Sequence, residues 1–317
     1  MATGDLGYMA LSIQNSFGTA TQSWHYLPFV SETLVHQMDR LTIEGIRASL
    51  VEAGVVAGIT RAAGDIVVEP DPNNIGYFLR SVFGQSSSET INHTFNFRLA
   101  DWSQKSPLPA YSVLIHRGAD EAFQFQDVIF PRMQLDIAAN ALARATFAAL
   151  GRVTTLTSVN ISSATAAYIE HTPWSWAVAS VSIGGVSPEY FESLSFVAEN
   201  PCEGLPMLNA STLWAKFGRS GRPNVRVNGR VDLENLNEYK RFSAQSVTNL
   251  TVYLDTMVAG GPEMKIVIPS FYYDSFPVSV RGSGRVTVDF AGRGIYNAGS
   301  GTAMTITLIN SYPDYND

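Results

Sequence analysis

Hydrophobic and polar residues alternate along much of the chain, for example around Val113 and Ile115, around Phe123 and Phe125, and over residues 305–310. Successive side chains of a β-strand point to opposite faces, so this alternation predicts strands with one buried and one solvated face. Glycine pairs and Gly-Ser-Gly stretches separate these segments, as tight turns between short strands require. The pattern therefore predicts a mainly β protein.

Two segments show helical spacing of their apolar residues instead. Residues 71–84 begin with an Asp suited to capping the first turn, continue with Pro, and end on Gly. Residues 233–244 place Leu236, Tyr239 and Phe242 at intervals of three. We expect one flanking helix in each half of the chain.

The two halves also resemble each other in sequence. Residues 111–137 align without a gap on residues 264–290, and residues 64–69 before the first helix resemble residues 229–234 before the second. Such self-similarity predicts two tandem copies of one unit of strands and a helix. The expected division is a first domain over residues 1–155, a polar linker over 156–172, and a second domain over 173–317 that ends in a short C-terminal arm.

Charged residues are scarce and acids exceed bases. The chain has 21 Lys and Arg against 28 Asp and Glu, a formal net charge of −7, and only 15% of its residues are charged. Because an average soluble protein has about 25% charged residues, we expect part of the apolar surface to be buried against neighbouring chains. An acidic chain also lacks the clustered cations with which proteins grip nucleic acid.

The sequence shows no pattern typical of catalysis, cofactor binding or metal binding. Cys202 is the single cysteine, which excludes an intrachain disulfide, and the five histidines are scattered. Asp232 and Glu234 could act as acid and base in glycan cleavage, but as alternate residues of one strand they are better explained as a polar face. No apolar run reaches the roughly 18 residues of a membrane span. We expect no enzyme activity, no cofactor, no metal and no membrane association.

Two long connections have the composition of contact surfaces. Residues 41–64 are unusually rich in Ala, Gly and Val, and an apolar loop of this length would be costly to leave in water. Residues 200–228 carry cations without an intervening acid, suited to phosphates or to an acidic neighbouring subunit, or simply to a solvated loop. The candidate contact residues are Arg47, Val51, Val55, Val56, Ile59, Lys216, Arg219, Arg222 and Arg226.

Each half contains a series of short motifs. In the first half these are residues 16–21 (SFGTAT), 27–29 (LPF), 64–69 (GDIVVE) before the helix, and 147–151 (FAALG). In the second half they are residues 179–185 (ASVSIGG), 192–196 (ESLSF), 229–234 (GRVDLE) and 304–310 (MTITLIN). In order and spacing, these motifs resemble the tail tube (major tail) proteins of long-tailed bacteriophages.

The resemblance implies two tandem tail-tube-type β-sandwich or barrel domains, each with one flanking α-helix and a long loop. Sheets of neighbouring subunits would join into a barrel around a channel, and stacked rings would form the conduit for double-stranded DNA and the tape-measure protein. Tail terminator and distal tail proteins are the further partners. Single-domain members form sixfold rings, so three two-domain chains would make a pseudo-hexameric ring, with a hexamer of chains as the alternative. The protein would be a virion tail component, assembled in the host cytoplasm.

In such a tube the two long connections would stack one ring on the next. Acids on alternating strands would face the channel and repel phosphate, so that DNA slides. The candidate channel acids are Asp65, Glu69, Asp232 and Glu234. Two other functions stay open: a tube subunit of a contractile injection system, and a two-domain carbohydrate-binding β-sandwich with exposed aromatic platforms.

Overall fold

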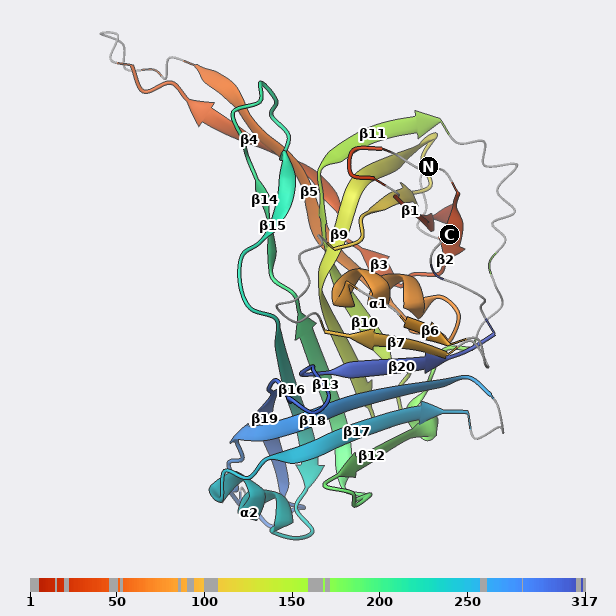
Figure 1. Cartoon of the computed structure of the whole chain (residues 1–317), viewed down its shortest axis with the longest axis vertical. Coiled ribbons are helices and arrows are strands. Elements are labelled where there is room, and N and C mark those ends of the chain that lie inside the picture. Colours follow the sequence, from red (N-terminus) through yellow and green to blue (C-terminus); the bar gives the residue numbers. More distant parts are fainter. Residues whose placement is uncertain are drawn as a thin grey trace.

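The computed structural model of the chain describes residues 6–14, 16–19, 23–45, 51, 54–84, 87–89, 94–99, 108–158, 168, 172–256, 261–280, 282–311 and 315. The elements of the first half are β1 (Tyr8–Ile13), β2 (His25–Leu27), β3 (Ser31–Glu32), β4 (Val35–Thr42), β5 (Val55–Val68), α1 (Ile75–Phe83), β6 (Ser87–Glu89), β7 (Thr94–Arg98), β8 (Tyr111–His116), β9 (Glu121–Ala138), β10 (Arg144–Gly151) and β11 (Val153–Ser158). Those of the second half are the 3₁₀ turn η3 (Trp176–Val178), β12 (Ala179–Ile183), β13 (Phe191–Glu199), β14 (Cys202–Leu205), β15 (Lys216–Arg219), β16 (Asn224–Asp232), α2 (Asn237–Ser243), β17 (Thr248–Asp255), β18 (Glu263–Ser275), β19 (Thr287–Gly294) and β20 (Thr305–Ile309). The prediction of a mainly β protein is confirmed (Figure 1).

The strands form two layers that enclose one apolar core. The first layer is a long antiparallel sheet in the order β4, β5, β10, β9, β13, β16, β19 and the end of β18. The second layer has two parts. One consists of β2, β1, β8, β9 and β11 of the first half. The other consists of β12, β17, β18 and β20 of the second half, continued by β7 and β6 of the first. In the second half its strands run across those of the long sheet (Figure 1). β9 and β18 each contribute to both layers.

One pattern of strand pairing occurs in both halves. In the first, β8 lies between β1 and β9, and β9 also pairs with β10 and β11. In the second, β17 lies between β12 and β18, and β18 also pairs with β19 and β20. The gapless alignment is therefore wrong by one strand: it matches β8 to β18, whereas the pairing makes β17 the counterpart of β8. Strands that share one alternation can be aligned in several registers, which explains the slip.

The halves are joined by strand pairing as well as by the chain. β9 pairs with β13, with Leu135 opposite Phe196, and β7 pairs with β20. The long sheet thus runs without a break from the first half into the second. The division into domains at residues 156–172 stays a prediction, although residues 156–158 already belong to β11, and residues 159–167 and 169–171 lie outside the described part.

Helix α1 has the predicted signals at both ends. The Asp71 carboxylate accepts hydrogen bonds from the backbone N–H groups of Asn73 and Asn74, at 3.0 and 3.1 Å. Gly84 ends the helix in the left-handed conformation (φ 75°), which favours glycine. All of its side chains except that of Arg80 are buried, and Phe78 stacks on Phe147 of β10. Local capping and spacing were sufficient to predict this helix.

Tyr315, near the C-terminus, is docked on the first turn of α1. Its side chain is fully buried, its hydroxyl donates to the Asn73 carbonyl at 2.8 Å, and its ring faces Tyr77 edge-on. A Cβ at Gly76 would lie 2.2 Å from the Tyr315 ring, so a glycine is needed there. Tyr315 belongs to the predicted C-terminal arm, and its side chain is buried within the chain. Residues 312–314, 316 and 317 of the arm lie outside the described residues.

Helix α2 buries a carboxylate, and of the three apolar residues that predicted it only Phe242 packs against the core. The helix is shorter than predicted, and Leu236 and Tyr239, whose spacing indicated the helix, are exposed. Glu238 is only 3% exposed. Its carboxylate accepts hydrogen bonds from Tyr190 (2.9 Å), Tyr273 (2.8 Å) and Arg241 (2.7 Å). The helix is therefore fixed to the sheet by a polar network that sequence spacing could not indicate.

Buried tyrosines make the fold sensitive to alkali. Burial raises the pKa of Tyr111 and of Tyr273 far above their ordinary value of 10.0, and the Glu238 carboxylate raises that of Tyr273 further. The folded chain keeps both protons while the unfolded chain loses them near pH 10, so stability should be intact below pH 10 and fall above it. The expected loss is about 1.4 kcal/mol per pH unit for each tyrosine. Urea unfolding between pH 8 and 11 tests this; a flat profile would contradict it.

Candidate functional site: an open sheet with projecting hairpins

The long sheet has one buried and one exposed face. Its buried side chains include Phe147, Leu135, Phe196 and Phe290, on strands β10, β9, β13 and β19. The residues between them point to the opposite, solvent-exposed face because side chains alternate along a strand. That face carries small, polar and charged residues.

Arginines on the exposed face are matched by carboxylates. Arg230 binds Asp289 and Arg293 binds Asp274, both at 2.7 Å. Two further arginines face acids across the ladders, Arg132 opposite Glu199 and Arg144 opposite Asp136. Arg226 differs, because the described ladders place Val197 and Arg293 opposite it. The face is thus close to charge-balanced.

Two of the four predicted channel acids lie on this face. Asp65 is on β5 and Asp232 is on β16, so β10, β9 and β13 lie between them, about 19 Å at the usual strand spacing. Glu69 and Glu234 follow the ends of these strands. The structure therefore does not bring the four acids together.

Sequence reasoning missed four acids of the exposed face: Asp136, Glu199, Asp274 and Asp289. Asp136 and Asp289 lie between buried residues of their strands, whereas Glu199 is the last residue of β13 and Asp274 lies near the end of β18. The alternation in β9 and β19 was a signal that could have found Asp136 and Asp289.

Both ends of the long sheet are open among the described residues. β3 and β4 pair only with β5, and residues 272–275 of β18 pair only with β19. An unpaired strand edge presents backbone donors and acceptors that another strand can pair with. The junction of β9 with β13 shows how such edges join within one chain.

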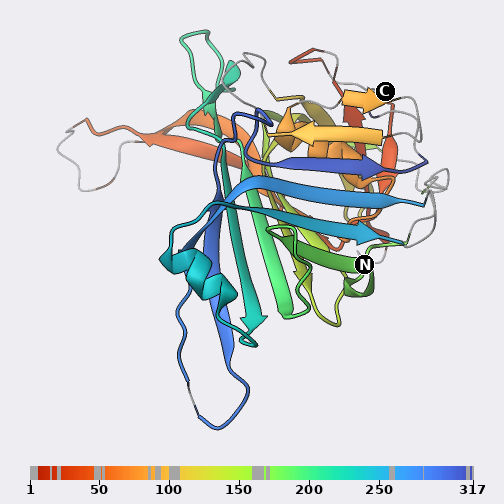
Figure 2. The same cartoon turned by 60° about the horizontal axis from the view of Figure 1, so that its bottom comes forward.

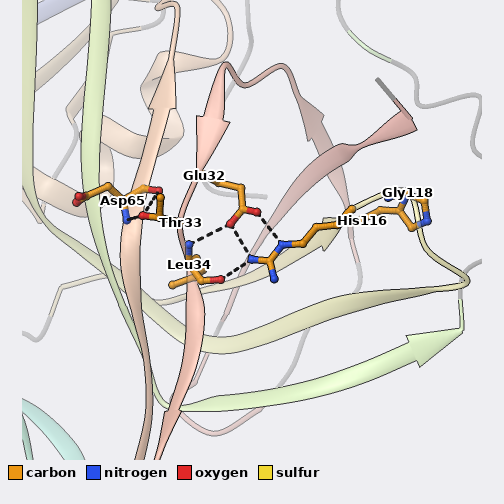
Figure 3. Close-up of polar contacts among 7 residues, drawn as sticks. Glu32, Thr33, Leu34, Asp65, His116 and Gly118 are labelled. Atoms are coloured by element: carbon orange, nitrogen blue, oxygen red, sulfur yellow. Dashed lines mark hydrogen bonds and ion pairs between the residues drawn. The ribbon is translucent and has the colours of Figure 1, made fainter. Parts of the chain in front are cut away.

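The open edge at β3 is held in place by an arginine from the turn between β8 and β9. The Arg117 guanidinium donates to both carboxylate oxygens of Glu32, at 2.7 and 2.8 Å, and to the Leu34 carbonyl at 2.6 Å. The Thr33 hydroxyl accepts from the backbone N–H of Asp65 at 2.9 Å (Figure 3). These contacts fix the edge strand before any partner binds.

The predicted loop over residues 41–64 is instead a long β-hairpin of β4 and β5, here called the arm. It projects from the body of the molecule (Figures 1 and 2). Its exposed apolar residues are Val35, Met38, Leu41, Ile43, Val51, Val55 and Val56. Of the candidate contact residues, Val51, Val55 and Val56 are exposed, Ile59 is half-buried, and Arg47 lies outside the described residues.

The predicted loop over residues 200–228 contains a second, smaller hairpin, β14–β15, and the first part of β16. Lys216 and Arg219 lie on β15, Arg222 follows it, and Arg226 lies on the exposed sheet face. The hairpin leans on the first half: the Thr60 N–H donates to the Thr212 carbonyl at 2.8 Å. The four cations therefore do not form one cluster in a loop.

The described residues contain no group of three or more potential metal-ligating side chains. In the same part of the chain, no helix is long and apolar enough to cross a bilayer. Open sheet edges and a projecting apolar arm, in contrast, define a structural protein that other chains complete.

The sequence comparison gives the family. Residues 4–294 match the family described as phage tail tube protein, and the chain belongs to it. The protein is a structural component of a phage tail, and its family implies self-association into a tube together with other tail proteins. No curated protein matches the chain. The resemblance seen in the motifs is thereby confirmed.

Proposed function

We propose that the chain assembles into closed rings that stack into the conduit for double-stranded DNA. The observation that carries this is the continuous long sheet with its two open ends. Within the chain, β9 of the first half pairs with β13 of the second. A similar junction could form between chains, where β18 of one copy would pair with β3 and β4 of the next. Three chains joined in this way would close a ring of six similar halves, two from each chain. Closure would leave no edge of the long sheet exposed.

Electron microscopy of the purified protein over a concentration series, with mass photometry on the same samples, tests this proposal. We expect hollow rings or tubes whose projections show three or six repeats, and a ring mass of three chains. A ring mass of six chains would favour the hexamer. A compact monomer at every concentration that binds glycans would favour the carbohydrate-binding alternative.

The exposed face of the long sheet is proposed to line the channel. DNA passing through such a channel would meet arginines that are already neutralised by Asp289, Asp274 and their neighbours. Unpaired cations of a protein bind DNA by displacing the counterions condensed on its phosphates. A wall whose cations are already paired with carboxylates therefore binds DNA weakly. The tape-measure protein would occupy the same channel before DNA, and terminator and distal tail proteins would close the tube ends. Assembly in the host cytoplasm is part of the same proposal.

Replacing Asp289 with Asn is expected to make this face bind DNA. The Arg230–Asp289 pair is exposed, so its loss should hardly change stability. The freed guanidinium should steepen the salt dependence of duplex binding by about 0.9 in the log–log slope, measured by fluorescence anisotropy at low salt. The matched control, D289N with R230Q, should return to wild-type binding. Equal binding of DNA by D289N and wild type would contradict the proposal that Asp289 keeps Arg230 from binding phosphate.

The tip of the arm is proposed to contact the next ring. Replacing residues 44–53 with Asn-Gly keeps β4 and β5 and closes them with a two-residue turn. We expect rings of normal mass that no longer stack, seen by negative-stain microscopy. The control is V51S, which keeps the arm's length. Tubes of intact length from the shortened variant would count against this role.

A further inference from the structure

A groove of about 1030 Å³ opens beside β16 and β19 of the second half. Three guanidinium groups line it, those of Arg222, Arg226 and Arg293. Two apolar side chains beside them are exposed, Ile295 at 38% and Tyr296 at 59%. Asp274 also lines the groove and neutralises Arg293, so the positive charge comes from Arg222 and Arg226. The groove therefore combines two cations with apolar surface.

The corresponding place in the first half is already filled. By their pairing, β5 and β10 are the counterparts of β16 and β19. There the segment between β14 and β15 lies against β5, with Leu213 beside Thr60 in a parallel bridge. Next to it, Phe17 packs between the Arg152 guanidinium (4.7 Å) and the Phe217 ring (5.7 Å). A hairpin of the second half thus covers this part of the first half.

The arm is the counterpart of that hairpin. β14–β15 lies between β13 and β16 in the second half, as the arm leads from the edge strand β3 into β5 in the first. Within one chain the hairpin has a place to dock, whereas the arm projects away from the body (Figure 1).

We propose that the groove binds the arm of a second copy of this chain. The apolar residues Leu41 and Val56, which lie opposite each other in the arm, would cover Ile295 and Tyr296. The exposed Glu44 would face Arg222 and Arg226. Between two chains, the arm would thus cover the second half as the β14–β15 hairpin covers the first half within one chain. It rests on the proposed ring and adds a side-to-side contact for the shaft of the arm, while the tip continues to the next ring.

Cysteine cross-linking between two variants tests this contact. One carries V56C and the other Y296C, both in a C202S background, because Cys202 is the chain's single cysteine. Both positions are exposed, so these changes should cost little stability. After mixing and assembly, a short bismaleimide should give a cross-linked dimer containing one chain of each variant. The matched control, V186C in place of Y296C, is equally exposed and should give at least tenfold less product.

The outcomes separate this contact from the proposed ring. Normal rings without the V56C–Y296C product would overturn the contact alone. Absence of both rings and product would overturn both. Because Arg222 and Arg226 could instead bind phosphate, the maleimide reactivity of Y296C in the unassembled chain is measured with and without duplex DNA. Protection by DNA, combined with no cross-linked product, would assign the groove to DNA. Loss of product in an R222E/R226E variant, and its recovery with E44R on the arm, would support the proposed pairing of charges.

Discussion

Replacing Tyr315 with Ala is expected to lower the free energy of unfolding by about 3–5 kcal/mol, the usual cost of removing a fully buried large aromatic side chain. The ring packs edge-on against Tyr77 and Phe95, with centroids at 5.1 and 4.7 Å. Truncation would leave a cavity between α1 and β7. Urea unfolding followed by circular dichroism gives the value.

Tyr315→Phe is the matched control. It keeps the ring and removes only the hydroxyl, which donates to the Asn73 carbonyl and accepts from the Asn310 amide. A cost of about 1–2 kcal/mol is expected, the range for losing a buried hydrogen bond. If the Ala variant were as stable as wild type, Tyr315 would not be docked on α1 in solution.

Replacing Glu238 with Ala should be similarly destabilising, by about 3–5 kcal/mol, because it leaves a partly buried Arg241 without its carboxylate partner. The hydroxyls of Tyr190 and Tyr273 lose their acceptor at the same time. The same urea unfolding experiment measures the loss.

Two variants separate charge from packing at this site. Glu238→Gln keeps the shape and one acceptor oxygen, so it should cost less than Ala. Y190F with Y273F removes the two hydroxyl donors, and in that background Glu238→Ala should cost less than it does alone. Equal costs in both backgrounds would show that the network does not act as a unit.

Several features of the fold were predictable from the sequence because they are local. Alternation indicates the strands and their faces. Asp65 and Asp232 lie on the exposed face of the long sheet, and their place in a channel stays a prediction. The cap and terminal glycine of α1 lie within the segment that they define. The face of α2 was not predictable, because Glu238 is buried by two tyrosines distant in sequence, Tyr190 before β13 and Tyr273 of β18.

The candidate surfaces depend on contacts that are distant in sequence. Arg230 is neutralised by Asp289, 59 residues later in the chain, so the basic run appears unpaired until the strands are aligned. The arm was mistaken for an irregular loop because its two strands lack the alternation of a half-buried sheet: most of its side chains are exposed. Apolar side chains on both faces of the arm are expected if a second chain covers them in the assembled tube.

The β9–β13 junction also changes the thermodynamics of closing a ring. Bringing two separate bodies together costs an estimated 4–15 kcal/mol or more of translational and rotational freedom. In a ring of three such chains, each chain forms one junction as it folds, so three of the six similar junctions do not incur that cost. The remaining three can therefore be individually weak and still close cooperatively. A chain of this design can remain dissociated while dilute and assemble sharply as its concentration rises.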